Sequence, residues 1–231
     1  MLEILYQDDH LVAINKPHGL MVHRSKLSGN TDEFAVQQLR DQIDTYVYPI
    51  HRLDRKTAGV LLFAKEQQLI APLQAQFQEG SVQKTYWTVL RGYTDSNGHI
   101  DYALTNDKGK IQEAVTDYRT LSQAEIDLPF GKFQTSRYSL VEAKPRTGRM
   151  HQLRKHFAHI NHPIIGDRPH GCNKQNKLFL EKWNMTTMLL HAKVLVFNHP
   201  LSEEVIQIEA AYSSEFERML DTLKLHPSYK E

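Results

Sequence analysis

Short apolar segments typical of β-strands recur along this chain, and their irregular alternation with helices limits the possible folds most strongly. Each segment is a run or an alternation of apolar residues next to turn-forming residues. The predicted strands are residues 2–6, 11–15, 60–64, 85–90, 116–121, 136–143, 189–197 and 205–208. A parallel sheet needs a long crossover, usually a helix, between successive strands. Because that regular βαβ alternation is missing, the pattern predicts an α+β fold with a largely antiparallel sheet.

Helices are predicted between some of these strands from apolar spacing and from signals at their ends. The predicted helices run from Asn30 to Ile43, up to Gln78, over residues 149–160 and from Ser214 to about Leu223. A capping box is predicted at the start of the first helix and of the last, with a glutamate three residues after Asn30 and after Ser214. Gly80 is expected to end the second helix, and Pro72 fits its first turn.

The composition excludes several classes of protein. The 231 residues are 40% hydrophobic and 24% charged, which excludes a wholly disordered chain. A single cysteine excludes a disulfide framework and a cysteine-based zinc module. The N-terminus lacks the pattern of a secretion signal, and no apolar run approaches the roughly 18 residues of a membrane span. These features predict a cytoplasmic protein.

Positive charge is concentrated in one part of the chain. The formal net charge is only +1, but residues 137–200 contain 11 basic and 3 acidic side chains, whereas the stretches on either side are net acidic. Seven of the 13 histidines lie in the same block. Such a block is either a solvated face or a binding surface for a polyanion such as a nucleic acid. Composition alone favours neither interpretation.

The segment 15–23, with the sequence NKPHGLMVH, predicts a rigid corner after a strand. A proline and a glycine two residues apart break the chain sharply. Such a corner is expected to project Lys16, His18 and His23. A purely structural turn is the simpler interpretation of these residues.

The segment 51–59, with the sequence HRLDRKTAG, places one carboxylate among cations. Asp54 is next to Arg55 and two residues from Arg52 and Lys56, and such neighbours favour the ionised form of a carboxyl group. An ionised carboxylate suits a nucleophile, or an anchor for an arginine, better than a general acid. The alternative is a surface cluster of ion pairs in a loop before a strand.

The segment 149–160 predicts a helix with one buried face. Its apolar residues lie three to four apart: Met150, Leu153, Phe157 and Ile160. Arg154 adjoins this face, and a guanidinium at the edge of a core is costly unless an anion pairs with it. Asp54 is a possible partner for Arg154.

A metal site would have to use the histidines of this basic block. His156, His159 and His162 are spaced by three residues, so they rotate around a helix instead of sharing one face. The histidine–glutamate motif of metalloproteases and cysteine ligand pairs are missing from the sequence. We therefore expect no metal site.

Four segments in this order resemble the pseudouridine synthases of the RluA family. They are NKPHGLMVH (15–23), HRLDRKTAG (51–59), QKTYWTVLRG (83–92) and TGRMHQLRKHFAHINHPIIGD (147–167). The resemblance implies an α+β fold with a curved, mainly antiparallel mixed sheet, flanking helices and a central catalytic cleft. It also implies a single catalytic domain over residues 1–231, without the N-terminal accessory RNA-binding domain that many relatives carry.

The resemblance implies a role for five residues. Asp54 matches the family's catalytic aspartate, which attacks C1′ or C6 of the flipped nucleotide or acts as a base at C2′. Tyr86 matches the tyrosine that stacks on the target base and takes the C5 proton, and Arg154 matches the basic residue that pairs with the aspartate. Arg52 matches the arginine that enters the RNA helix, and Leu153 an apolar wall of the pocket.

The remaining expectations concern the substrate. Four further residues of the matching segments are expected to bind RNA: His51, Arg55, Arg149 and His151. The resemblance implies a monomer without a cofactor, a metal, a membrane or an obligatory protein partner. It is strongest to members that isomerise uridine 65 in the T-stem of tRNA.

Three alternatives stay open: another tRNA or rRNA uridine, a non-catalytic RNA-binding module, and a histidine-dependent metallohydrolase. Chelator sensitivity separates the metallohydrolase from the other two.

Overall fold

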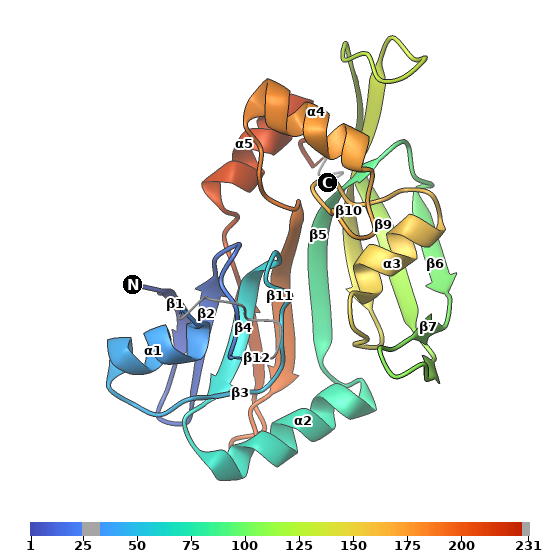
Figure 1. The fold of residues 1–231 in the computed structure, drawn as a ribbon. Coiled ribbons are helices and arrows are strands. Elements are labelled where there is room, and N and C mark those ends of the chain that lie inside the picture. Colours follow the sequence, from blue (N-terminus) through green and yellow to red (C-terminus); the bar gives the residue numbers. More distant parts are fainter. Residues whose placement is uncertain (25–32, 228–231) are drawn as a thin grey trace. The chain divides into compact units, whose positions relative to one another are not determined.

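The computed structural model describes residues 1–24 and 33–227, which form two compact units (Figure 1). The first unit comprises Met1–Lys84 and His191–Ala211. The second unit comprises Thr85–Leu190 and the segment from Tyr212 onward. The expectation of a single catalytic domain over residues 1–231, without an N-terminal accessory domain, stays a prediction.

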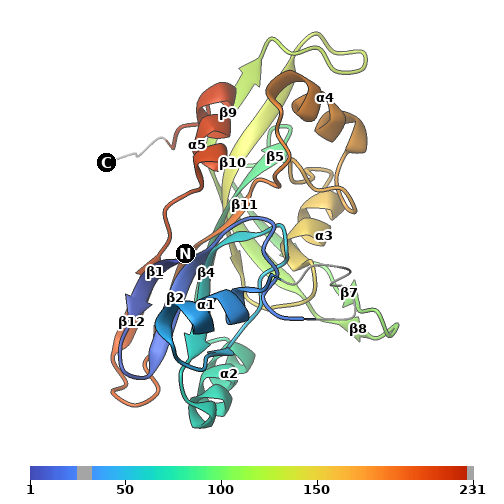
Figure 2. The ribbon, with the colours of Figure 1, turned by 60° about the vertical axis from the view of Figure 1, so that its left-hand side comes forward.

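The strands of the first unit form a mixed sheet. They are β1 (Glu3–Gln7), β2 (Leu11–Lys16), β3 (Tyr48–Pro49), β4 (Ala58–Ala64), β11 (Leu190–Asn198) and β12 (Val205–Glu209). Strands β1 and β2 form the predicted antiparallel hairpin, β2 and β3 pair with β4, and β12 pairs with β11. Only β4 and β11 pair in parallel among these strands. Strand β12 also lies near β1 (Figure 2).

Strand β4 is the centre of the first unit, and all seven of its residues are buried. Val60, Leu62 and Ala64 alternate along one face and join the core with Leu73 of the neighbouring helix. Gly59 has a φ of +110°, and a Cβ atom there would lie 2.2 Å from the Ala192 carbonyl oxygen of β11. Only glycine therefore allows β11 to pair this closely where β4 begins.

The helices of the first unit are α1 (Ala35–Ile43), the 3₁₀ turn η1 (Gln67–Leu69) and α2 (Ile70–Glu79). Helix α2 ends as predicted, because Gly80 adopts a φ of +79° and donates its N–H to the Gln76 carbonyl. Helix α1 begins later than predicted, and its N-cap residue Phe34 makes no side-chain cap bond. Asn30, the predicted cap, lies outside the described residues.

The strands of the second unit are all antiparallel. They are β5 (Gln83–Arg91), β6 (Asn97–Asp101), β7 (Leu104–Thr105), β8 (Ile111–Gln112), β9 (Val115–Ile126) and β10 (Ser136–Pro145). Strand β10 pairs with β5 and β9, and β9 also pairs with β6. Strands β7 and β8 form a separate hairpin. The sequence pattern did not predict β6, β7 or β8, which lie in a region without a usable motif.

Helices cover both faces of β5 in the second unit. They are α3 (Gln152–His159), α4 (Asn173–Trp183) and α5 (Ser214–Leu223). Leu90 of β5 joins a core cluster with Leu153 of α3, whereas the adjacent Val89 joins a cluster with Phe179 of α4 and Phe216 of α5. Alternate residues of a strand point to opposite faces, so α3 covers one face and α4 and α5 cover the other.

Two details of these helices differ from the prediction. The last helix is capped by Ser213, whose hydroxyl accepts the Phe216 N–H at 3.2 Å, and Ser214 is already helical. Met150, predicted in the buried face of the third helix, is 43% exposed because it lies in the turn before α3 begins. Helix α4 was not predicted.

The predicted fold class is confirmed: the chain is α+β, with mixed, mainly antiparallel strand pairing and flanking helices. No helix in the described part of the chain is both long enough and apolar enough to span a membrane.

Candidate active site

Asp54 lies in a loop of the first unit between β3 and β4. The side chain of Leu53 before it is buried, and Asp54 itself is only half-buried. After it, the Thr57 N–H donates to the Asp54 carbonyl at 3.0 Å, and Thr57 is buried. Both sides of the loop are thus anchored, which holds the main chain of Asp54 in place.

A second loop fastens the Asp54 loop. Lys16, at the end of β2, is completely buried and donates from Nζ to the carbonyls of Pro17 at 2.9 Å, Leu20 at 2.8 Å and Arg55 at 3.3 Å. Burial lowers the pKa of this ammonium group to about 7, and the negative charge of Asp54 opposes that shift. The expectation that Lys16 projects from the corner is wrong, because three carbonyls draw it inward.

The same two loops are joined a second time. The Gly19 N–H donates to the Arg55 carbonyl at 2.8 Å, and the Arg55 Nε donates back to the Gly19 carbonyl at 2.9 Å. The structure therefore brings together the segments 15–23 and 51–59, which the sequence presented as independent.

Several cations lie close to His18 and His23, on the loop that contacts the Asp54 loop. Burial, followed by the charges of Lys16, Lys56 and Arg55, lowers the pKa of His18 to about 4. His18 is therefore neutral at pH 7 and lies near these cations. Burial also lowers the pKa of His23, together with the charge of Arg52. The cations of these two loops are suited to bind an RNA phosphate close to Asp54.

His51 faces the interior of the first unit. Its Nε2 accepts the Leu62 N–H at 3.2 Å, and its ring stacks on Phe77 with the centroids 5.0 Å apart. Burial lowers the pKa of His51 to about 4, followed by the charge of Lys84. The ring is thus neutral and holds the loop to β4 and α2. Its predicted contact with substrate stays a prediction.

Tyr86 and Leu153 share one core cluster in the second unit. Tyr86 lies on β5 opposite Ala143 of β10, and its partly buried ring packs against the cluster that contains Leu153 of α3. Leu153 is 6% exposed. The structure therefore places a tyrosine beside the apolar wall that the sequence predicted.

Arg154 of α3 is bound by an acid that the sequence reasoning missed. Its Nε and one Nη donate to the two carboxylate oxygens of Asp167, each at 2.8 Å. Both side chains are buried, with exposed fractions of 6% and 1%. A guanidinium has five donors, and the bond to Asp167 uses two of them.

The loop that carries Asp167 is itself held rigidly. The Asp167 carbonyl accepts the Asn176 Nδ2 at 2.6 Å, and the Gly166 N–H donates to the Asn176 Oδ1 at 2.9 Å. Gly166 has a φ of +85°, and a Cβ atom there would lie 2.0 Å from the Thr187 carbonyl oxygen. One signal for Asp167 was present: it is one of only three acids in the basic block.

The turn before α3 places two further candidates. Arg149 is half-buried and donates from Nε to the Glu113 carbonyl at 3.0 Å. His151 adopts a φ of +56°, and its Nδ1 lies 2.9 Å from the Nε2 of His170. Gln152 secures this turn by donating to the Val115 carbonyl at 2.9 Å.

The histidines of the basic block have other partners than a metal. His156 is fully buried, with its ring nitrogens 3.0 Å from the Thr116 hydroxyl and from the Tyr102 carbonyl. His159 stacks on Tyr102 at 3.6 Å between centroids. The described residues contain no group of three histidines, cysteines or acids that could hold a metal ion. His156 is therefore a core residue and does not belong to an RNA-facing surface.

The candidate catalytic residues are divided between the units. Asp54 and Arg52 belong to the first unit, whereas Tyr86, Leu153 and Arg154 belong to the second. Within the second unit, Leu153 and Arg154 are adjacent on α3, and Tyr86 lies against the cluster of Leu153.

The chain matches known proteins over most of its length. Residues 10–159, which include the Asp54 loop and α3, match the family model of the RNA pseudouridylate synthases. A protein of Vibrio parahaemolyticus named tRNA pseudouridine synthase C is 44% identical over 229 residues, 94% of this chain and 93% of that protein. The protein of the same name from Yersinia pestis is also 44% identical, over 95% and 90% of the two chains.

A solved structure matches the fold as well. The human protein RNA pseudouridylate synthase domain containing 4 superposes with a TM-score of 0.74 at 26% identity, over 98% of this chain and 95% of that chain. The fold and these matches define an isomerase that acts on RNA. The chain belongs to the RNA pseudouridylate synthase family. The predicted family and class of enzyme are thereby confirmed.

Proposed function

We propose that this protein isomerises a uridine of tRNA to pseudouridine, at position 65 of the T-stem. The observation that carries the proposal is the 44% identity, over nearly the whole length of both chains, to proteins named tRNA pseudouridine synthase C. The name of these relatives specifies tRNA, and position 65 comes from the resemblance of the sequence to that branch of the family.

The reaction breaks the glycosidic bond between C1′ of ribose and N1 of uracil and rejoins the sugar to C5. The base rotates in between, and the proton displaced from C5 is balanced by the proton gained at N1. No electron is gained or lost and no group leaves, so the reaction needs no redox cofactor. Asp54 is the catalytic carboxylate, and attack at C1′, attack at C6 and proton abstraction at C2′ all begin with an ionised carboxylate.

The other proposed roles follow from chemistry at the flipped nucleotide. A base inside a duplex must leave its stack first, which costs a few kcal/mol, and the exposed Arg52 takes its place in the helix. Tyr86 stacks on the uracil and takes the C5 proton through its hydroxyl. Leu153 supplies an apolar wall, and Arg154 pairs with Asp54 and orients it.

The binding residues supply contacts to the RNA backbone. Arg55, whose side chain is exposed, and Arg149 are suited to phosphate contacts. His151 is proposed to contact the RNA near the start of α3. His51 supports the Asp54 loop because its Nε2 accepts the Leu62 N–H. Its proposed contact with the substrate is made by its main chain or by an edge of its ring. We further propose a cytoplasmic monomer that acts without a protein partner.

The test is the modification of a defined substrate. Unmodified tRNA transcribed in vitro is incubated with the protein, and pseudouridines are mapped by chemical labelling and primer extension. The expected product is a single pseudouridine at position 65, and a transcript with cytidine at that position should yield none. A product at another uridine would overturn the specific site and leave the activity standing. A product only in rRNA would overturn the tRNA assignment.

A further inference from the structure

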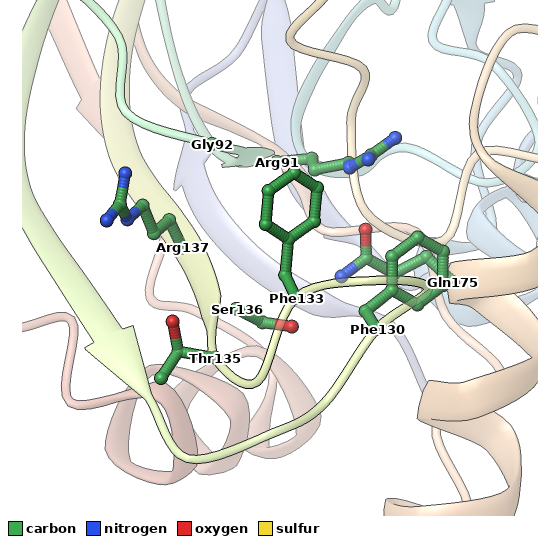
Figure 3. Close-up of a pocket in the computed structure, with 8 residues that line it drawn as sticks. All are labelled: Arg91, Gly92, Phe130, Phe133, Thr135, Ser136, Arg137 and Gln175. Atoms are coloured by element: carbon green, nitrogen blue, oxygen red, sulfur yellow. The ribbon is translucent and has the colours of Figure 1, made fainter.

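A pocket of about 250 Å³ lies in the second unit, where β5 ends and the β9–β10 connection returns (Figure 3). The lining residues are Arg91, Gly92, Phe130, Phe133, Thr135, Ser136, Arg137 and Gln175. None of them belongs to the four segments that resemble the family's motifs except Arg91 and Gly92, which end the third segment. No proposed role in the reaction uses this pocket.

The aromatic residues that line the pocket lie in a tight turn, and one of their rings is exposed. Phe130 and Phe133 exchange two backbone hydrogen bonds, at 3.0 and 3.2 Å, which fix a tight turn. The Phe133 side chain is 59% exposed, an unfavourable position for a large apolar ring unless it has a partner. Figure 3 shows the Phe130 and Phe133 rings grouped with the Arg91 side chain and the Gln175 amide.

Positive charge borders these rings, and no lining residue is acidic. The Arg91 guanidinium lies 5.2 Å from the centroid of Phe130, and the Lys132 ammonium lies 5.5 Å from that of Phe133. Arg137 is bound to Glu125 at 3.0 Å and points away from the rings (Figure 3), so its charge is largely compensated. Arg91 and Lys132 are therefore the cations that a ligand at these rings would meet.

One buried polar atom beside the pocket lacks a hydrogen-bond partner among the described residues. Gln175 is 2% exposed, and its Nε2 donates to the Tyr138 hydroxyl at 2.6 Å. Its Oε1 is buried and accepts no hydrogen bond. An unsatisfied buried acceptor is costly, and a donor from a bound ligand would remove the cost. Exchanging the two amide atoms would still leave one of them without a partner.

Aromatic faces, a cation and an unsatisfied amide are together the chemistry that recognises a nucleotide. We propose that this pocket binds one unstacked nucleotide of the RNA substrate, outside the catalytic site. Its base stacks on Phe133, an N–H on its edge donates to Gln175, and its phosphate meets Arg91. The proposal rests on the proposed function only in that the substrate is an RNA.

The nucleotide in this pocket is distinct from the target uridine. Tyr86 and Arg91 lie five residues apart on β5, which corresponds to about 17 Å along the strand. Tyr86 packs on the cluster covered by α3, whereas Arg91 points to the other face, like Val89 two residues before it. The bound RNA must therefore continue around the end of β5.

The first test is the affinity for unmodified tRNA. Phe133→Ala removes an exposed ring, so the fold should be retained, and the loss of one stacked base should raise the Kd about tenfold. The matched control is Tyr46→Ala, which removes an exposed tyrosine that also lies under an arginine, Arg40 at 4.9 Å. That control should leave the Kd unchanged. Under saturating tRNA, Phe133→Ala should keep kcat within about twofold of wild type.

Two further variants separate the contacts. Arg91→Gln should lower the slope of log Kd against log salt by about one phosphate contact, whereas Phe133→Ala should leave the slope unchanged. In a Tyr138→Phe background, Gln175→Leu removes the acceptor without leaving the Tyr138 hydroxyl unpaired, and it should weaken binding about fivefold relative to Tyr138→Phe without changing the slope. A photo-crosslinking phenylalanine analogue at position 133 should label one nucleotide other than the target.

The possible outcomes distinguish this proposal from the proposed function. Normal pseudouridine formation with unchanged tRNA affinity in Phe133→Ala would overturn the pocket and leave the enzyme standing. If tRNA binding depends on Phe133 but no pseudouridine is formed, the proposed function is overturned and the pocket proposal stands. If only free uridine or adenosine monophosphate, and not tRNA, binds in a manner that depends on Phe133, the RNA proposal is overturned. A crosslink to the target uridine, or no binding of tRNA by the wild type, would overturn it as well.

Discussion

Arg154 connects the proposed chemistry to the stability of the second unit. Its bidentate bond to Asp167 is buried, so each charge is compensated by the other in a place that water does not reach. Two buried ions held in this way are costly to separate, because the one that remains has no solvent to replace its partner. A loss of activity after substitution of Arg154 would therefore have two causes, lost chemistry and lost folding.

The first prediction separates these causes. Arg154→Met leaves the buried Asp167 carboxylate uncompensated and should lower the free energy of unfolding by about 3–5 kcal/mol. The double variant Arg154→Met with Asp167→Asn removes that charge and should regain much of the stability, measured by urea denaturation. Pseudouridine formation should stay absent in both variants. If the double variant regains activity along with stability, Arg154 is a structural residue only.

At the level of secondary-structure elements, the packing of Gly59 against β11 fixes the end of the Asp54 loop, where β4 begins. Gly59 touches the main chain of β11 so closely that no side chain fits, and five residues before it is the proposed catalytic carboxylate. The adjacent loop 16–20 fastens the same region through Lys16 and Gly19. Backbone packing on both sides of the loop thus helps to fix the position of Asp54.

The second prediction concerns Gly59→Ala. The new Cβ atom would meet the Ala192 carbonyl in a backbone conformation that alanine rarely adopts, so the free energy of unfolding should fall by more than about 3 kcal/mol. The matched control is Gly80→Ala, where φ is also positive but a Cβ atom meets nothing within 4 Å. That change should cost only about 1 kcal/mol. Equal losses in the two variants would show that the contact with β11 is unimportant.

The sequence pattern predicted most elements but not the pairing between them. The β1–β2 hairpin and the glycine-ended helix α2 depend on local signals, so they were predicted correctly. Strands β6 to β8 are short and weakly apolar, with several exposed residues, and gave no periodic signal. Asp54 stood out among its cations, but Asp167 did not. Its place among only three acids of the basic block is its one signal in the sequence, and that signal does not identify it as the partner of Arg154.

At the scale of the whole molecule, charge counted along the sequence overstates the positive charge that RNA can meet. Arg146 of the basic block lies 2.5 Å from the Asp117 carboxylate, and Arg137 lies 3.0 Å from Glu125. Both acids come from β9, outside the basic block. The excess of positive charge in residues 137–200 is thus partly compensated by residues distant in sequence.

The third prediction is that the buried histidines lower the free energy of unfolding in mild acid. Burial lowers the pKa of His51 and of His191 to about 4, from an ordinary value of 6.5. Between these values the unfolded chain binds protons that the folded chain excludes, so stability is full above pH 6.5 and falls as the pH drops towards 4. His18 has a pKa lowered to about 4 as well, and three such groups should give a slope of roughly 3–4 kcal/mol per pH unit near pH 5.

Urea denaturation at several pH values from 7 to 5 measures this slope. His191→Asn should reduce it by about a third, whereas His226→Asn, at a side chain that is 66% exposed, should leave it unchanged. A free energy of unfolding that stays constant from pH 6.5 to 5 would contradict the assignment of neutral, buried histidines.

The central claim is that this chain isomerises uridine with the Asp54 carboxylate. Asp54→Asn keeps the size of the side chain and removes its charge, and Asp54 is only half-buried, so the fold and the binding of tRNA should survive. The decisive measurement is pseudouridine formation in unmodified tRNA by wild type and Asp54→Asn, with Kd measured on the same samples. The account predicts one pseudouridine per tRNA for the wild type and none for the variant, at a Kd within about threefold of wild type. Product formation by Asp54→Asn at the wild-type rate would contradict it.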